Sequence, residues 1–197
     1  MFKWLRLVFI IGMGFSSTAM AFEFSLGTRV GGVQQKANSS VRSMKDNALA
    51  YGVESTFIAP VGTKIALGVN VTADKFDVEF EDYAVRYNNS LYTGSVVVGY
   101  RFDNIGEFGS DNSLLYAKLG AAKWRRQYKD GRTPNLTESG TELLYGLGFK
   151  YTNDKNLYTG IEFNYFSMDT SPLGRLEKDD MGKVDNLLLM LTAGYRF

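Results

Sequence analysis

Apolar and polar residues alternate in eight segments of this chain, and no other feature limits its fold as strongly. In the first segment, Phe22, Phe24 and Leu26 alternate with Glu23 and Ser25. Successive side chains of a β-strand point to opposite faces, so this period of two predicts a strand with one apolar face. The segments are 22–31, 49–57, 65–74, 92–102, 115–122, 142–151, 157–165 and 187–197. We therefore expect an all-β fold.

The lengths of the connections separate two all-β folds. A soluble antiparallel sandwich also shows this alternation, with its apolar face turned inward. Outer-membrane barrels instead alternate short periplasmic turns with long outer loops. Long and shorter connections alternate in this chain, in the order 32–48, 59–64, 75–90, 103–112, 125–140, 152–156 and 167–185. This order favours an eight-stranded antiparallel up-and-down transmembrane β-barrel with both termini in the periplasm.

The polar faces of the predicted strands carry balanced charge. They hold five acidic and five basic side chains, namely Glu23, Glu54, Asp74, Glu142, Glu162, Arg29, Arg101, Lys118, Lys150 and Arg196. They also hold ten glycines, which suit the inside of a narrow barrel where side chains converge. Isolated charge is costly in such an interior. We expect a salt-bridge cluster that plugs the lumen, formed by Arg29, Glu54, Lys118 and Glu162.

The chain contains no histidine and no cysteine. It therefore lacks the usual general base near neutral pH, a thiolate nucleophile and the commonest metal ligands. A catalytic carboxylate pair of Glu54 and Glu162 is the remaining option, but the nearby cations favour a structural role for both. We predict no catalytic residue, no cofactor and no metal site.

A second basic group lies lower on the polar faces. Arg101, Lys150 and Arg196 are expected near Glu23, close to the periplasmic mouth of the barrel. These side chains can bind phosphate, or they can simply face the water at the mouth. The sequence favours the second interpretation.

The N-terminal segment has the order of a secretory signal peptide. Lys3 and Arg6 form a basic start, residues 7–15 form an apolar run, and the letters AMA at 19–21 form a cleavage site. A membrane-anchoring helix is the alternative, but the apolar run is shorter than the ~20 residues that span a bilayer. We expect residues 1–21 to be a signal peptide and residues 22–197 to form the barrel domain.

Aromatic residues close the last predicted strand, where Tyr195 and Phe197 flank Arg196. Aromatic rings are favoured at the lipid interface. The eight strands, the segments LLYAKLGAAKW and LYGLGFKYTND and the terminal AGYRF resemble the small OmpA/OmpX-type outer-membrane barrels. The resemblance implies that the outer-membrane assembly machinery reads Tyr195 and Phe197 as its signal. The chain stops at the barrel, so we expect no peptidoglycan-binding domain.

The outer loops carry whatever binding specificity the protein has. In the basic loop 125–140, the candidates for contact with lipopolysaccharide phosphates are Arg125, Arg126, Lys129 and Arg132; a solvated surface is the simpler alternative. The near-neutral balance of 22 Lys and Arg against 21 Asp and Glu gives no reason to expect nucleic acid as a partner.

The resemblance implies a non-enzymatic protein in the outer membrane of a Gram-negative bacterium. Such a protein would support the membrane, contact its lipid, and present loops for adhesion or for an unidentified extracellular or host ligand. A narrow porin-like channel or carrier for small solutes is the alternative. Eight strands enclose a space that side chains just fill, which favours the structural role.

Overall fold

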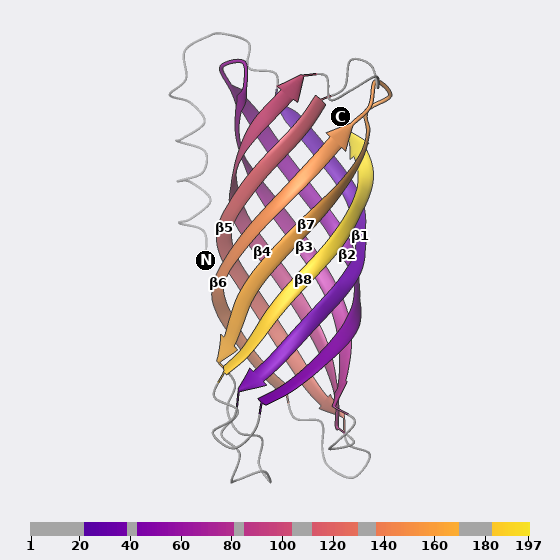
Figure 1. Cartoon of the computed structure of the whole chain (residues 1–197), viewed down its shortest axis with the longest axis vertical. Coiled ribbons are helices and arrows are strands. Elements are labelled where there is room, and N and C mark those ends of the chain that lie inside the picture. Colours follow the sequence, from indigo (N-terminus) through magenta and orange to yellow (C-terminus); the bar gives the residue numbers. More distant parts are fainter. Residues whose placement is uncertain (1–21, 39–42, 81–84, 104–111, 130–136, 170–182) are drawn as a thin grey trace, which may run out of the picture.

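Eight antiparallel strands, each paired with the next along the chain, form a closed barrel (Figure 1). The computed structural model describes residues 22–38, 43–80, 85–103, 112–129, 137–169 and 183–197. The strands are β1 (Glu23–Asn38), β2 (Ser43–Val61), β3 (Ile65–Phe80), β4 (Val85–Asp103), β5 (Asn112–Lys129), β6 (Thr137–Thr152), β7 (Leu157–Asp169) and β8 (Lys183–Arg196). The predicted fold class is confirmed. None of the described residues forms a helix long and apolar enough to cross a membrane.

The barrel closes between its first and last strands. β1 pairs with β8 from Ser25 opposite Arg196 to Asn38 opposite Lys183. The start of β1 and the end of β8 therefore lie at the same end of the barrel, which carries the C label in Figure 1. The backbone N–H of Phe197 donates to the carbonyl of Phe24 at 2.7 Å, so the chain is still bonded to the wall at its last residue.

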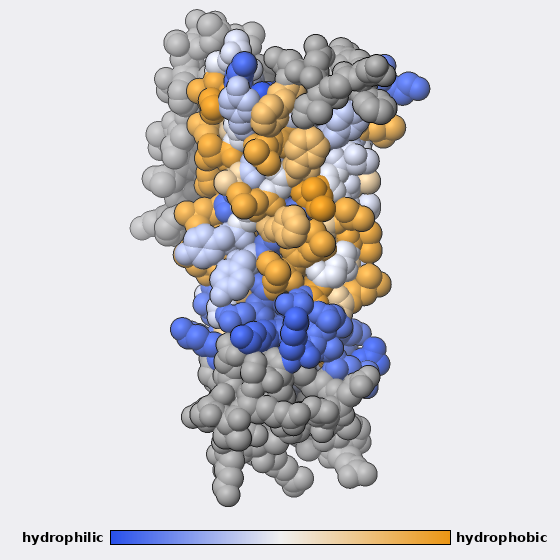
Figure 2. All heavy atoms as spheres, viewed as in Figure 1, coloured by the Kyte–Doolittle hydropathy of each residue, from blue (hydrophilic) through white to orange (hydrophobic). Residues whose placement is uncertain are grey.

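The outward faces of the strands are apolar, as the alternation predicts. Leu49, Leu119, Leu147 and Leu191 each leave more than half of their surface exposed. Figure 2 shows this apolar surface as an orange band, followed by a blue hydrophilic band at the end away from the C terminus. A continuous apolar belt of this kind is unfavourable in water and fits a lipid environment.

Several strands are longer than the sequence predicts, and the additional residues lie at the end of the barrel away from the chain ends. β1 continues to Asn38 and β2 begins at Ser43, so the predicted long loop 32–48 is wrong, and so is the predicted loop 75–90 between β3 and β4. The alternation is hidden in these stretches because the outward side chains lie beyond the apolar belt and are polar, as at Gln34, Lys36 and Asp77. The connection 39–42 is as short as 153–156, so the contrast in loop length is weaker than predicted.

Apolar side chains fill the lumen in the half of the barrel away from the chain ends. We call this cluster the apolar plug; its members are Val33, Ala50, Phe76, Val78, Tyr87, Leu91, Ala122, Trp124, Leu144, Phe166, Met168, Val184, Leu188 and Met190. A smaller buried cluster lies in the other half and consists of Ile58, Ala66, Val97, Leu114 and Tyr116. The lumen is therefore apolar in two layers, a feature that the sequence analysis did not predict.

Two seams of the barrel, β2–β3 and β6–β7, are paired over only part of their length, and the ladder between β6 and β7 is the shorter one. β6 and β7 pair from Thr152 opposite Tyr158 up to Tyr145 opposite Tyr165. Beyond that point the described residues 141–144 of β6 pair with β5 alone, and residues 166–169 of β7 pair with β8 alone. The wall is thus joined by a shorter ladder here than at its other seams.

Candidate functional site

The centre of the lumen is organised around Glu162, a carboxylate with no exposed surface. Lys118 Nζ lies 2.7 Å and Arg29 Nη1 3.0 Å from Glu162 Oε1. The Tyr116 hydroxyl donates to Glu162 Oε2 at 2.8 Å, and Asn164 Nδ2 donates to Oε1 at 2.7 Å. These groups come from β1, β5 and β7, so the network ties distant strands together across the barrel.

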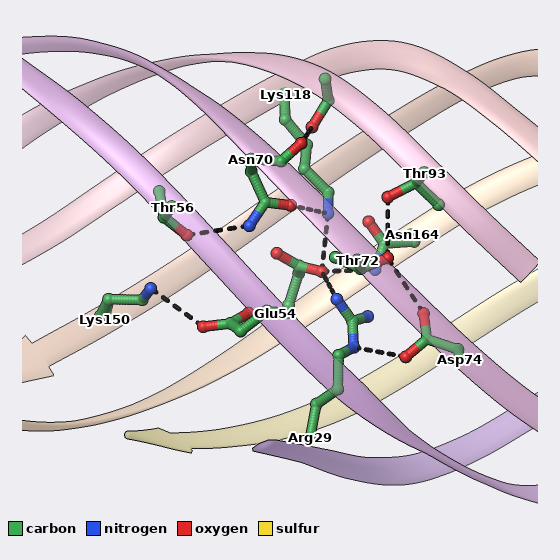
Figure 3. Close-up of polar contacts among 12 residues, drawn as sticks. Arg29, Glu54, Thr56, Asn70, Thr72, Asp74, Thr93, Lys118, Lys150 and Asn164 are labelled. Atoms are coloured by element: carbon green, nitrogen blue, oxygen red, sulfur yellow. Dashed lines mark hydrogen bonds and ion pairs between the residues drawn. The ribbon is translucent and has the colours of Figure 1, made fainter. Parts of the chain in front are cut away.

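Arg29 links this carboxylate to a second one. Its Nε lies 3.0 Å from Asp74 Oδ1, and both side chains are almost fully buried. Asp74 Oδ2 accepts a hydrogen bond from Thr72, whose hydroxyl is 2.8 Å from that of Thr93. Figure 3 shows Arg29 between Lys118 and Asp74 in the lumen. We call Arg29, Asp74, Lys118 and Glu162 the central ion-pair network.

Glu54 belongs to a separate group. Lys150 Nζ lies 3.0 Å from Glu54 Oε1, and the Tyr158 hydroxyl donates to the same oxygen at 2.8 Å. The Lys150 ammonium also lies 4.1 Å from the centre of the Tyr158 ring. The predicted cluster of four residues is thus divided. Arg29 and Lys118 contact Glu162, whereas Glu54 pairs with Lys150, which was expected near Glu23 at the periplasmic mouth.

Inward glycines make room for these long side chains. A Cβ atom on Gly146 of β6 would lie 2.6 Å from Lys118 Cε and 2.7 Å from Asn164 Oδ1. Contacts this close do not occur between real Cβ atoms and their neighbours. The absence of a side chain at position 146 therefore lets Lys118 lie flat across the lumen and reach Glu162.

The mouth at the chain ends has its own ion pairs. Arg101 Nη1 lies 2.8 Å from Glu23 Oε1, and Arg196 Nη1 lies 3.8 Å from Glu23 Oε2. Arg196 also donates from Nη2 to Asn156 Oδ1 at 3.1 Å. Glu23 therefore holds two arginines at once, as the sequence analysis expected for this end of the barrel.

The predicted assembly signal lies on the outer surface of the closing strand. Tyr195 and Phe197 are both exposed, the latter to 68%. Their ring centres are 5.0 Å apart, and the Phe197 ring lies 5.8 Å from that of Phe24. Together with Phe24, the two rings form an aromatic group on the lipid-facing wall, as in the interfacial girdles of outer-membrane barrels, and they remain accessible.

The structure places Arg125 and Arg126, two of the four candidate lipopolysaccharide contacts, on opposite sides of the barrel wall. Arg125 is exposed on the outer wall, but Arg126 is only 2% exposed and points into the lumen. Its guanidinium donates to Gln35 Oε1 at 3.2 Å and lies 4.4 Å from the centre of the Tyr87 ring. The prediction for Arg126 is therefore wrong, because β5 continues through this position and turns alternate residues inward. Lys129 ends β5, and Arg132 lies outside the described residues.

The arrangement in the lumen suits stability better than chemistry. Glu162, Asp74 and Glu54 are each held by a cation within 3.0 Å. Among the described residues, no group of three or more carboxylates gathers in a way that could hold a metal ion. Buried charges that pair in this way avoid the cost of isolated burial.

The alternation predicted Asp74 on the inner face without a partner and Lys150 near Glu23, whereas Lys150 pairs with Glu54. The apolar plug was not predicted. A signal for the plug was available. Continuing the period of two beyond the apolar belt turns Val33, Phe76 and Val78 inward, on the same face as Trp124. Apolar residues at inward positions, opposite polar outward ones, are the reverse of the pattern in the belt.

Comparison with known proteins agrees with this geometry. Ail, the attachment invasion locus protein of Yersinia pestis, is 21% identical with a TM-score of 0.53, covering 90% of this chain and 100% of that one. A major outer membrane protein from Thermus thermophilus is 18% identical with a TM-score of 0.55, over the same shares of the two chains. At these identities the likeness shows the fold. No curated protein matches the chain in sequence.

The sequence also matches a family model. The model describes the outer membrane protein beta-barrel domain and covers residues 7–197. This match confirms the resemblance to small outer-membrane barrels inferred from the strands and the terminal AGYRF. The chain therefore belongs to the outer-membrane protein β-barrel family.

Proposed function

We propose that this protein is a non-enzymatic component of the outer membrane of a Gram-negative bacterium that supports the membrane and presents its outer end for surface interaction. The observation that carries the proposal is the filled lumen. The apolar plug occupies one half, the central ion-pair network follows, and a second apolar cluster lies beyond it. A barrel filled in this way offers no path for solutes, so its function rests on its surfaces.

The non-enzymatic part of the proposal rests on the residues themselves. The whole chain lacks histidine and cysteine, and its best carboxylate candidates, Glu54 and Glu162, are each bonded to a lysine at 3.0 Å or less. A carboxylate held between buried donors is a poor general base, because protonating it would break its ion pairs.

In the proposed orientation, both termini face the periplasm and the strand extensions face outward. The extensions of β1–β4 support this, because they carry polar outward side chains beyond the apolar belt. An epitope inserted in 130–136 should label intact cells, whereas the same epitope in 104–111 should label only permeabilised cells. Labelling of intact cells through 104–111 alone would invert the orientation.

The alternative function is a narrow porin-like channel or carrier. The polar groups at mid-height, including Asn70 and Asn164, are the feature that favours it. Conductance of the refolded protein in a planar bilayer decides between the two, with a general porin in the same bilayer as the positive control. We expect no steady conductance of porin size; a steady porin-like current would support the channel and defeat the structural role.

For contact with lipopolysaccharide we propose Lys75, Lys123 and Arg125, in place of Arg126. All three are exposed on the outer wall. The first two pair across strands with Tyr51 and Tyr92, exposed tyrosines that we assign to an outer aromatic girdle. Cations just beyond an interfacial aromatic girdle lie where lipid phosphates are found. Lipopolysaccharide should therefore raise the Tm of the wild-type protein.

The matched test replaces these outer-wall cations without touching the lumen. Lys123→Gln combined with Arg125→Gln should reduce the lipopolysaccharide-dependent rise in Tm. Lys45→Gln, which removes an exposed cation on β2, should leave it unchanged. Equal responses of all three proteins would argue against a specific contact. The remaining proposed partners are the assembly machinery at Tyr195 and Phe197 and an unidentified extracellular or host ligand.

A further inference from the structure

A small cavity opens at the mouth of the barrel that carries the chain ends. Its free volume is about 30 Å³, and its polar lining consists of Arg101, Arg196, Lys150, Ser25, Ser113, Thr152, Tyr158 and one carboxylate, Glu23. A single water needs roughly 10–15 Å³ of such space. The cavity therefore admits a group larger than one water, and most of the polar atoms around it are hydrogen-bond donors.

Two of these donors have no acceptor in the described part of the protein. Ser113 is 1% exposed, and its Oγ has no hydrogen-bond partner. Arg101 uses Nη1 for Glu23, but its buried Nε has no partner. Buried donors are nearly always satisfied, so a pair of unsatisfied ones around one cavity indicates a missing acceptor.

The charges around the cavity do not balance. Lys150 is neutralised by Glu54, which lies deeper in the lumen at 3.0 Å. Glu23 alone faces the two arginines, at 2.8 Å from Arg101 and 3.8 Å from Arg196. Arg196 turns its other nitrogens to the neutral amide of Asn156. Among the described residues, the two arginines therefore share one carboxylate, which leaves an excess of positive charge.

We propose that this mouth binds an oxyanion of the phosphate class. Its oxygens would accept hydrogen bonds from Arg101 Nε and Ser113 Oγ, and its charge would offset the excess of Arg101 and Arg196 over Glu23. Arginine favours this geometry because its planar donors match the oxygens of a phosphate. The phosphate can be a free ion or the headgroup of a phospholipid at this end of the barrel. The site is distinct from the outer surface to which the proposed function is assigned.

The test titrates the folded protein with inorganic phosphate in octyl glucoside, a detergent without phosphate, at constant ionic strength set with chloride. The NMR signals of the Arg101 side-chain Nε–H and of the Ser113 amide should shift and saturate. Arg101→Gln should weaken binding by about tenfold or more, because it removes a charged donor. Arg101→Lys keeps the charge but lacks the Nε–H, so it should bind more weakly than wild type.

Arg86→Gln is the matched control, because it removes an exposed arginine on β4 at the opposite end of the barrel. Heat-modifiable migration of each variant on a gel confirms folding before binding is measured. Phosphate shifts no larger than those caused by chloride, or an equal loss of binding in Arg86→Gln, would overturn the proposal.

A second arm identifies the source of the phosphate. The protein is placed in nanodiscs of phosphatidylglycerol or of a phosphate-free galactolipid, with no phosphate in the buffer. A shift of the Arg101 Nε–H signal in phosphatidylglycerol alone assigns the site to a lipid headgroup. A shift that needs added phosphate in both lipids assigns it to the free ion. No shift in any condition overturns the site.

Discussion

Lys118 and Glu162 lie 2.7 Å apart at the centre of the barrel, and neither side chain has any exposed surface. They stand on β5 and β7, which are not neighbours in the wall. The ion pair therefore crosses the lumen above β6, where Gly146 leaves the space. Lys118 also donates to Asn70 Oδ1 of β3 at 3.3 Å, so one ammonium joins opposite sides of the barrel.

Lys118→Ala should destabilise the barrel by about 3–5 kcal/mol, because it leaves the buried carboxylate of Glu162 with Arg29 as its one remaining cation within the described strands. The measurement is the free energy of unfolding in denaturant for protein refolded into lipid vesicles. Arg86→Ala is the control, because its pair with Asp77 is 57% and 50% exposed and should contribute roughly 1 kcal/mol at most. A loss below about 0.5 kcal/mol for Lys118→Ala would count against the network.

Trp124→Ala should cost about 3–5 kcal/mol, since it empties part of the apolar plug and no lipid can enter to fill the space. Leu119→Ala provides the comparison on the same strand, because Leu119 points outward and lipid chains can occupy the space that its side chain leaves. The same unfolding experiment measures both. If the two variants lose equal stability, the apolar plug is not a packed core.

The backbone amides of β6 should exchange hydrogen faster beyond the end of the β6–β7 ladder, on the side away from the chain ends, than within the ladder. The described residues 141–144 of β6 are paired on one side only, whereas Phe149 and Tyr151 lie between two paired strands. Amides in 141–144 that point away from β5 lack a strand partner and should exchange first. Residue-resolved exchange in nanodiscs measures the difference. Uniform protection from position 141 to position 151 would show that the seam is closed in the membrane.

Phe197→Ser should lower the amount of folded barrel in the outer membrane more than Arg196→Ser does. Phe197 is the exposed end of the closing strand, whereas Arg196 points to the mouth and binds Glu23 and Asn156. Spontaneous refolding into detergent should suffer less from Phe197→Ser, because the pairing of β8 with β1 remains. Membrane abundance and refolding yield are measured for both variants. Equal behaviour in cells would mean that Phe197 is not the assembly signal.

The period of two along the chain is enough to assign each residue of the apolar belt to one side of the wall. Side chains alternate with a period of two in any strand, so the inward position of Arg29 and Glu162 and the outward position of Phe197 follow from counting along the chain. Continuing the same count along β5 turns Trp124 inward, where it is buried. Eight such strands with apolar outer faces also predict the barrel. In lipid every backbone polar group must be paired, so strands can span the membrane only as a closed barrel.

Which inward groups meet depends instead on the three-dimensional arrangement of the strands. The height of an inward side chain along the barrel axis depends on how far each tilted strand is staggered against the next. The sequence of a single strand does not reveal this stagger. It brings Lys150 to Glu54 instead of Glu23, and it turns Arg126 toward Gln35. The lengths of the strands were hidden for a related reason: beyond the lipid the outward face is polar, so the alternation that marks a strand disappears while backbone pairing continues.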